Sequence, residues 1–170
     1  MASSRRKSDR RSPTPALHDY EFFAERSLDS ASFVNPLVAA GLRVHRFFQH
    51  VLQPDAEDGI WIKYAAERGW ISLTGDRDIG SIPEEIEDVM KCRARVLVLT
   101  FGHGTNHPIL AENFLRTGSR IASFLRQHRA PYIAKINRPT QENWMLGKPG
   151  EIRMYRTHAD WLAHRHRRRR

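Results

Sequence analysis

Two aspartates follow directly on a hydrophobic segment near the middle of the chain. Residues 70–74, "WISLT", have the composition of a buried strand, and Gly75, Asp76, Arg77 and Asp78 follow them. Two carboxylates one residue apart can bind a divalent metal ion, but they are also typical of a solvated turn. Further carboxylates from other parts of the chain are needed to favour a metal site over a turn.

Two other segments place acids where they could join this pair. Glu25 follows a predicted strand at residues 20–24, and Asp58 lies at the predicted start of a helix. The carboxyl ends of parallel strands meet at one edge of a sheet, where ligands gather. The candidate metal ligands and catalytic residues are therefore Glu25, Asp58, Asp76 and Asp78.

Four carboxylates at one edge would form a hard, oxygen-rich site of the kind that Mg²⁺ and Mn²⁺ favour. Such an ion lowers the pKa of a bound water and offsets charge on a leaving oxygen, which is the chemistry of phosphodiester hydrolysis. The spacing alone also allows a simpler interpretation, in which Asp58 only caps its helix and the aspartate pair only forms a turn.

The elements that must position these acids alternate between short strands and longer helices. Strands are predicted at residues 20–24, 43–51, 70–74, 95–101, 131–138 and 142–146. Helices are predicted at residues 30–42 and 58–69, from Ser81 to Met90, and as one long helix from Asn106 through Leu125. This alternation predicts an α/β fold with three α/β/α layers and a central, mainly parallel sheet.

Basic, polar tails flank the predicted domain. We expect a disordered basic N-terminal tail at residues 1–15, a folded domain at 16–147 and a C-terminal extension at 148–170 that ends in an arginine-rich tail. Of the net charge of +9, residues 1–12 contribute +4 and residues 156–170 contribute +5, so the remainder of the chain is neutral. Such tails suit nucleic acid, or an acidic partner protein.

Several other classes of function are disfavoured. No apolar run approaches the roughly 18 residues of a membrane span, so no membrane association is expected. Cys92 is the single cysteine, which excludes an internal disulfide and favours the cytoplasm. Ser72 and Ser119 lack the pattern of a serine hydrolase. His103 and His107 lie in a glycine-rich segment with no third ligand nearby, so zinc is not expected.

Four segments carry a pattern that is also found in a known family. They are "FFAERSL" (22–28), "DGIWIKYAAERGWISLTGDRDI" (58–79), "RVLVLT" (95–100) and "PYIAKINR" (131–138). In their order and spacing they resemble PIN-like domains, in particular the VapC-type toxin branch. The resemblance implies a compact α/β/α fold, an acidic cluster that binds Mg²⁺ or Mn²⁺, and ribonuclease activity as the toxin of a type II toxin–antitoxin pair.

The resemblance also assigns the acids by position. Asp58, Asp76 and Asp78 match acids of the family pattern, whereas Glu25 stands where the family usually has aspartate. The resemblance further implies an RNA substrate, an antitoxin partner and a homodimer. Glu25 keeps the charge but is one methylene longer, which bears on activity more than on fold.

We therefore expect a metal-dependent endoribonuclease that hydrolyses RNA phosphodiester bonds. Two alternatives stay open: a non-catalytic nucleic-acid-binding protein on a degenerate PIN-like fold, and a nuclease that acts on DNA. Glu25 is the main support for the binding protein.

Overall fold

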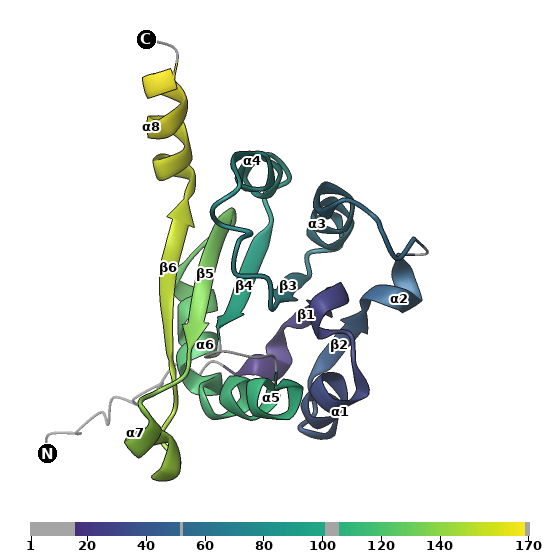
Figure 1. The fold of residues 1–170 in the computed structure, drawn as a ribbon, viewed down its shortest axis with the longest axis vertical. Coiled ribbons are helices and arrows are strands. Elements are labelled where there is room, and N and C mark those ends of the chain that lie inside the picture. The colour runs from purple at the N-terminus through teal and green to yellow at the C-terminus, as the bar shows by residue number, and fades with distance from the viewer. Residues whose placement is uncertain (1–15, 52, 101–105, 169–170) are drawn as a thin grey trace, which may run out of the picture.

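A central sheet organises the chain in the computed structural model, which describes residues 16–51, 53–100 and 106–168 (Figure 1). Within these residues the sheet has six strands in the order β2-β1-β3-β4-β5-β6. All neighbouring strands are parallel except β5 and β6, which are antiparallel. The strands are β1 (Glu21–Ala24), β2 (Arg43–Arg46), β3 (Ile71–Thr74), β4 (Arg95–Thr100), β5 (Tyr132–Asn137) and β6 (Glu151–Thr157).

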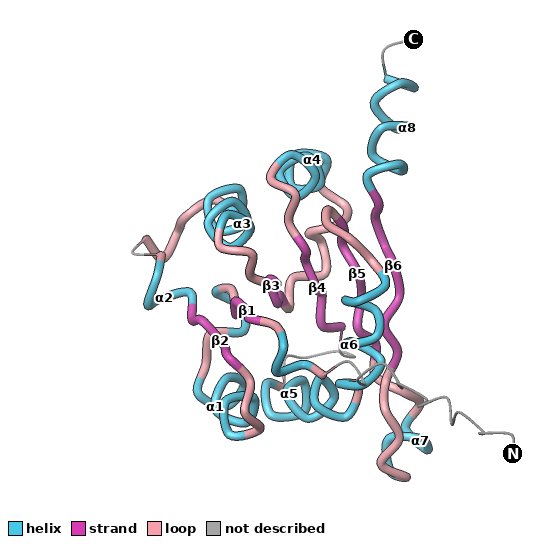
Figure 2. Tube along the Cα trace, turned by 180° about the vertical axis from the view of Figure 1, so that it is seen from behind, coloured by secondary structure: helices cyan, strands magenta, loops and turns pink. Residues whose placement is uncertain are grey.

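Helices cover both faces of the sheet. One face carries α1 (Ala31–Ala39), α5 (His107–Arg116) and α6 (Gly118–Gln127). The other carries α3 (Asp58–Glu67) and α4 (Pro83–Lys91), as Figures 1 and 2 show. The shorter helical segments are η1 (Leu17–Asp19), η2 (Arg26–Leu28), α2 (Phe47–His50) and α7 (Gln141–Met145). The predicted three-layer α/β/α fold is confirmed.

The last helix stands apart from these layers. Helix α8 (His158–Arg168) continues from β6 and projects beyond the body of the domain (Figure 1). No helix in the described ranges is both long and apolar enough to cross a membrane. The predicted disordered tail at 1–15 lies outside the described residues.

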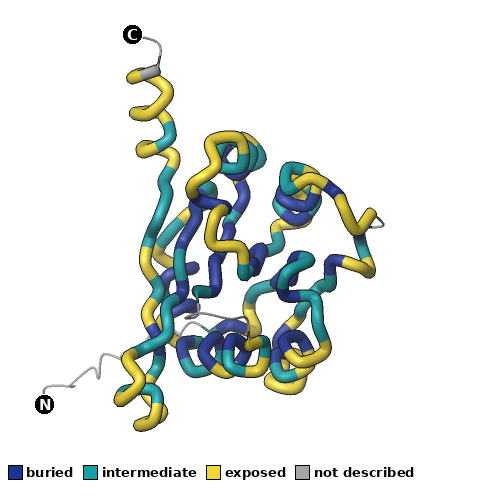
Figure 3. Tube along the Cα trace, viewed as in Figure 1, coloured by how far each residue is buried: buried dark blue, intermediate teal, exposed yellow. Residues whose placement is uncertain are grey.

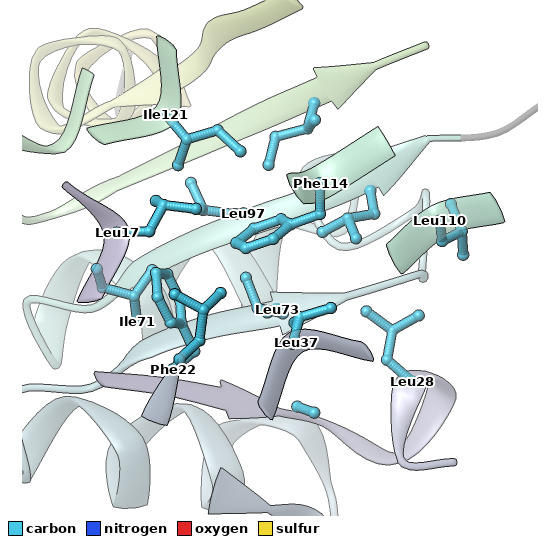
Figure 4. Packing of buried hydrophobic residues seen from close by; sticks show 14 of the residues in the cluster. Leu17, Phe22, Leu28, Leu37, Ile71, Leu73, Leu97, Leu110, Phe114 and Ile121 are labelled. Carbon is cyan, nitrogen blue, oxygen red and sulfur yellow. The ribbon is translucent and has the colours of Figure 1, made fainter. Parts of the chain in front are cut away.

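Alternating side chains on the strands divide the core into two clusters. In β1, Phe22 faces the α1, α5 and α6 side, whereas Phe23 faces the α3 and α4 side. This is the two-residue period of a strand that is buried on both faces. Figure 4 shows the first cluster, in which the rings of Phe22 and Phe114 pack edge-to-face with 5.4 Å between their centroids.

Strands β1, β3 and β5 lie where the sequence predicts them, and β4 is described as far as Thr100. The predicted strand at 43–51, however, is only half correct, because the chain turns into α2 at Phe47. The side chain of Asp29 causes this departure, since it accepts the backbone N–H of Phe48 and the Nε–H of Arg46. The prediction overlooked this long-range acceptor and followed the apolar composition alone.

The prediction of a strand at 142–146 is wrong, because these residues form α7. Thr140 caps this helix by accepting the backbone N–H of Asn143. Met145 and Leu146 are exposed, so the apolar residues of this segment do not indicate a buried strand. The edge of the sheet is formed instead by β6, which lies within the predicted C-terminal extension and hydrogen bonds to β5.

The predicted long helix from Asn106 is also two helices, α5 and α6, which meet at Thr117. The hydroxyl of Thr117 accepts the backbone N–H of Gly150 across 2.9 Å, which ties the junction to the segment that enters β6. At Gly118 a side chain would meet Leu17, because its Cβ would lie only 3.1 Å from that leucine's Cδ1. The break therefore follows from tertiary packing around the junction.

Replacing Phe114 tests the packing of the first cluster. Phe114→Ala removes a ring that is fully buried against Phe22 and leaves a cavity. We expect the free energy of unfolding, measured by urea denaturation, to fall by about 3–5 kcal/mol. Phe48→Ala is the control, because Phe48 is 51% exposed and should change stability far less. Equal losses in the two variants would contradict this description of the core.

Candidate active site

The predicted site residues occupy the carboxyl edge of the parallel strands. Glu25 directly follows β1, and Asp76 and Asp78 follow β3. Asp58 is the first residue of α3. Because Ala24 of β1 pairs with Leu73 of β3, the residues after them emerge side by side.

The carboxylate of Glu25 is buried and fixed by hydrogen bonds. Its side chain is held at Oε1 by three donors: the backbone N–H of Ser27, the hydroxyl of Ser27 and the hydroxyl of Thr74, the last across 2.8 Å. Burial raises the pKa of Glu25 above its usual value, and the hydrogen bonds from Ser27 and Thr74 only partly oppose this. The charge of Asp58 raises this pKa further.

The same network reaches the loop after β3. The hydroxyl of Thr74 accepts the backbone N–H of Asp76 across 3.0 Å, and the hydroxyl of Ser27 accepts that of Gly75 across 2.8 Å. Glu25 therefore determines, through two hydroxyl groups, the course of the chain that carries the aspartate pair.

The simpler interpretation of the sequence, in which Asp58 caps α3, is wrong. The residue before it, Glu57, occupies the cap position, and Asp58 lies in the first helical turn. Its Oδ1 accepts the indole N–H of Trp61 across 2.7 Å and lies 3.9 Å from a guanidinium nitrogen of Arg26. A carboxylate at this position also interacts favourably with the positive end of the helix dipole.

Asp76 and Asp78 form a turn with exposed side chains. The backbone N–H of Asp78 donates to Oδ1 of Asp76 across 2.9 Å, and the carbonyl of Asp78 accepts the N–H groups of Ser81 and Ile82. The turn that the sequence allows is therefore present. It leaves Oδ2 of Asp76 and both carboxylate oxygens of Asp78 outside these bonds.

The sequence prediction missed a fifth carboxylate, that of Glu85 in the first turn of α4. Burial, a hydrogen bond with Asp58 and the charges of Asp58, Asp76 and Asp78 raise the pKa of Glu85 to about 7. Its Oε2 is buried without a hydrogen-bond partner. The signal for it was present, because residues 55–88 contain ten acids and three bases, but a glutamate in the first turn of a helix is ordinary.

Helices α3 and α4 approach closely behind the five acids. A side chain at Gly59 would place its Cβ 2.6 Å from a carboxylate oxygen of Asp88. The absence of a side chain at Gly59 therefore lets α3 and α4 lie close enough for Glu85 to reach Asp58.

Burial and neighbouring carboxylates raise the pKa values of Glu25 and Glu85, yet the five acids do not form a preformed metal site. Across residues 16–51, 53–100 and 106–168, no three His, Cys, Asp or Glu side chains are arranged so that they could hold a metal ion together. The chemistry of the donors nevertheless fits a hard divalent cation, because all are carboxylates and the buried Oε2 of Glu85 lacks a partner. Burial raises the pKa of Glu85 most, and a cation would offset the further contribution from the charges of Asp58, Asp76 and Asp78.

His107 supports this site and is not available as a zinc ligand. Its Nε2 hydrogen bonds to the carbonyl of Ser27 across 2.9 Å, and its Nδ1 to the hydroxyl of Ser30 across 2.6 Å. Asn106 caps α5 by accepting the N–H of Ile109. His103 lies outside the described residues.

Comparison with known proteins bears on the same part of the chain. The family model described as PIN like domain matches residues 21–101. This segment runs from β1 to the end of β4 and contains all five acids. No curated protein and no solved structure matches the chain. PIN-like domains are a nuclease-type fold, so the match supports a nuclease in general, whereas the VapC-type branch stays a prediction.

Two substitutions of Glu25 distinguish its role as a hydrogen-bond acceptor from the effect of its negative charge. Glu25→Ala leaves the donors of Ser27 and Thr74 without their acceptor, and we expect the free energy of unfolding to fall by at least about 2 kcal/mol. Glu25→Gln retains an acceptor oxygen and should stay close to the wild type at pH 7. Urea denaturation of both variants measures this, and an alanine variant as stable as the glutamine variant would count against the network.

The raised pKa of Glu85 predicts a specific dependence of stability on pH. Between its usual value of 4.5 and about 7, the folded protein binds more protons than the unfolded chain. The stability that this group contributes is therefore complete below pH 4.5 and is lost as the pH rises through about 7. Glu85→Gln cannot titrate, so its free energy of unfolding should fall less than that of the wild type between about pH 5 and pH 8.

Urea denaturation at the two pH values provides the measurement. Glu84→Gln is the matched control, because Glu84 is the exposed neighbour in the same helical turn. A Glu85→Gln variant with the same pH dependence as the Glu84→Gln control would be evidence against the coupling of Glu85 to the aspartates.

Proposed function

We propose that this protein is a metal-dependent endoribonuclease that hydrolyses RNA phosphodiester bonds with Mg²⁺ or Mn²⁺. The observation that supports this most is the gathering of carboxylates at the carboxyl edge of the sheet: besides burial, the charges of Asp58, Asp76 and Asp78 raise the pKa of Glu85, and the charge of Asp58 also raises that of Glu25. The match of residues 21–101 to the PIN-like domain favours a nuclease over other uses of such an edge. The resemblance to VapC-type toxins adds the preference for RNA.

In this proposal the metal ligands come from Asp58, Asp76, Asp78 and Glu85. Glu25 positions the loop after β3 through its hydrogen bonds with Ser27 and Thr74. When bound, the ion would activate a water and stabilise charge on the leaving oxygen. Because the side chains of Asp76 and Asp78 are exposed, the ligand set would assemble when the ion binds. A bound cation would relieve the repulsion among the acids, which favours binding.

The biological setting is proposed on the resemblance and on charge. We propose that the protein is the toxin of a type II toxin–antitoxin pair, held inactive by an antitoxin, and that it forms a homodimer. A single cysteine favours the reducing cytoplasm. The basic chain ends would add salt-dependent attraction for RNA.

Cleavage of a mixed, structured RNA by the purified chain tests the proposal. With Mg²⁺ or Mn²⁺ the wild type should cut, and either Asp76→Asn or a chelator should lower the rate about 100-fold or more. Asp55→Asn is the matched control, because Asp55 is an exposed aspartate in the loop before α3, outside the group of five acids, and should retain activity.

A second readout does not depend on turnover. Mg²⁺ should raise the thermal midpoint of the wild type and of Asp55→Asn, and should raise that of Asp76→Asn much less, since a ligand that binds only the folded state stabilises it. Parallel reactions on DNA address the alternative of a DNA-directed nuclease.

The non-catalytic binding protein remains the second candidate, and Glu25 favours it. Its three hydrogen bonds and its burial explain this residue without any ion. A wild type that binds RNA in a salt-dependent manner, yet neither cuts with either metal nor gains stability from them, would establish this candidate over the ribonuclease.

A further inference from the structure

A hollow of about 530 Å³ lies between α4 and α8. Ser81, Pro83 and Ile86 line one wall, at the start of α4. Trp161 and Arg165 of α8 line the opposite wall. The hollow therefore separates the body of the domain from the projecting helix.

The first wall is continuous with the candidate active site. Ser81 and Pro83 lie between Asp78 and Glu85 in the chain, and the carbonyl of Asp78 accepts the N–H of Ser81 across 2.7 Å. A ligand in the hollow thus touches the segment that connects two of the five acids.

Strand β6 ties the second wall to the same segment. The Nε–H of Arg156 donates to the carbonyl of Gly80 across 3.0 Å, and the hydroxyl groups of Tyr155 and Ser81 lie 3.4 Å apart. A side chain at Gly80 would collide with the ring of Tyr155. These contacts between β6 and the segment at Gly80 and Ser81 determine where α8 begins.

The charges around the hollow favour an anion. Arg156, Arg165 and Arg167 line it together with two acids, and both acids have partners of their own. Asp160 accepts the N–H and the hydroxyl of Thr157 at the start of α8, and Glu87 lies 2.7 Å from the ammonium group of Lys91. Glu87 also interacts with Arg165, and Asp160 with Arg156, so the three arginines exceed the two acids of the hollow by one positive charge.

An aromatic ring accompanies these arginines. Trp161 is half-buried against the core below α4, and the guanidinium carbon of Arg165 lies 4.8 Å from the centre of its ring. The outer side of α8 is exposed along its length (Figure 3). An indole beside arginines is the combination that holds an unpaired base by stacking while its phosphates are neutralised.

We propose that the hollow between α4 and α8 binds a single-stranded segment of RNA and leads it to the acidic site. This inference rests on the proposed function and names the form of its substrate. Single-stranded RNA is favoured over duplex, because a paired base cannot leave its stack to lie on Trp161. It is favoured over an acidic peptide, because a peptide would make no comparable use of the indole face.

Binding to the full chain tests the proposal without turnover. The probe is a labelled single-stranded RNA of mixed sequence, followed by fluorescence anisotropy with a chelator present. Trp161→Ala should weaken binding about tenfold or more, since one stacked base contributes that much. Trp144→Ala is the matched control, because Trp144 lies on α7, at the opposite end of the molecule from α8 (Figure 1).

Two further variants guard against a loss of structure. Arg165 is exposed, so Arg165→Ala should leave the fold intact, weaken binding and reduce its salt dependence by about one phosphate contact. Trp161→Phe should recover part of the affinity, because a phenyl ring still stacks. The same substitutions should affect a duplex of the same sequence much less.

The outcomes distinguish this inference from the proposed function. Loss of binding in Trp161→Ala and Arg165→Ala supports the RNA site, even if the wild type proves unable to cleave. Affinities equal to that of Trp144→Ala would overturn it. So would unchanged RNA affinity combined with weaker binding of polyglutamate, which would assign the hollow to an acidic protein partner.

Discussion

A buried carboxylate is the constraint on which the acidic edge depends. Glu25 is only 4% exposed, and a buried carboxylate must be satisfied by hydrogen bonds. Ser27 and Thr74 provide them, and the same two hydroxyl groups accept N–H groups from the loop after β3. The requirement of one side chain thus aligns the ends of β1 and β3. His107 extends this arrangement by bonding to the carbonyl of Ser27.

Further carboxylates lie close to Glu25, so negative charge is concentrated at this edge of the sheet. Asp58 and Glu85 each lie in the first turn of a helix, where the helix dipole stabilises a carboxylate. The dipoles do not cancel the other effects, because burial and the neighbouring carboxylates still raise the pKa of Glu85 to about 7. A fold that retains such repulsion gains from a cation, which is why the proposed metal-dependent chemistry is consistent with the electrostatics of this edge.

The end of the chain adds positive charge beside α4, the helix that carries Glu85. Strand β6 closes the sheet antiparallel to β5, and its Arg156 holds the carbonyl of Gly80 in the acidic loop. Helix α8 then carries Trp161 and Arg165 along the hollow beside α4. Strand β6 therefore connects the loop that follows the aspartate pair to the helix that carries Arg165.

The sequence by itself determined the features that depend on local pattern. The compositions of β1, β3 and β5 predicted these strands, their alternation with helices predicted the α/β fold, and Asp76 and Asp78 were evident at a strand end. Tertiary structure decided the remainder. It made 142–146 a helix rather than a strand, and it made β6 the sheet edge although its residues are exposed or half-exposed and include three charges. It also brought Glu85 to Asp58, because contacts between separate helices depend on how their faces pack, and no local period in the chain records that packing.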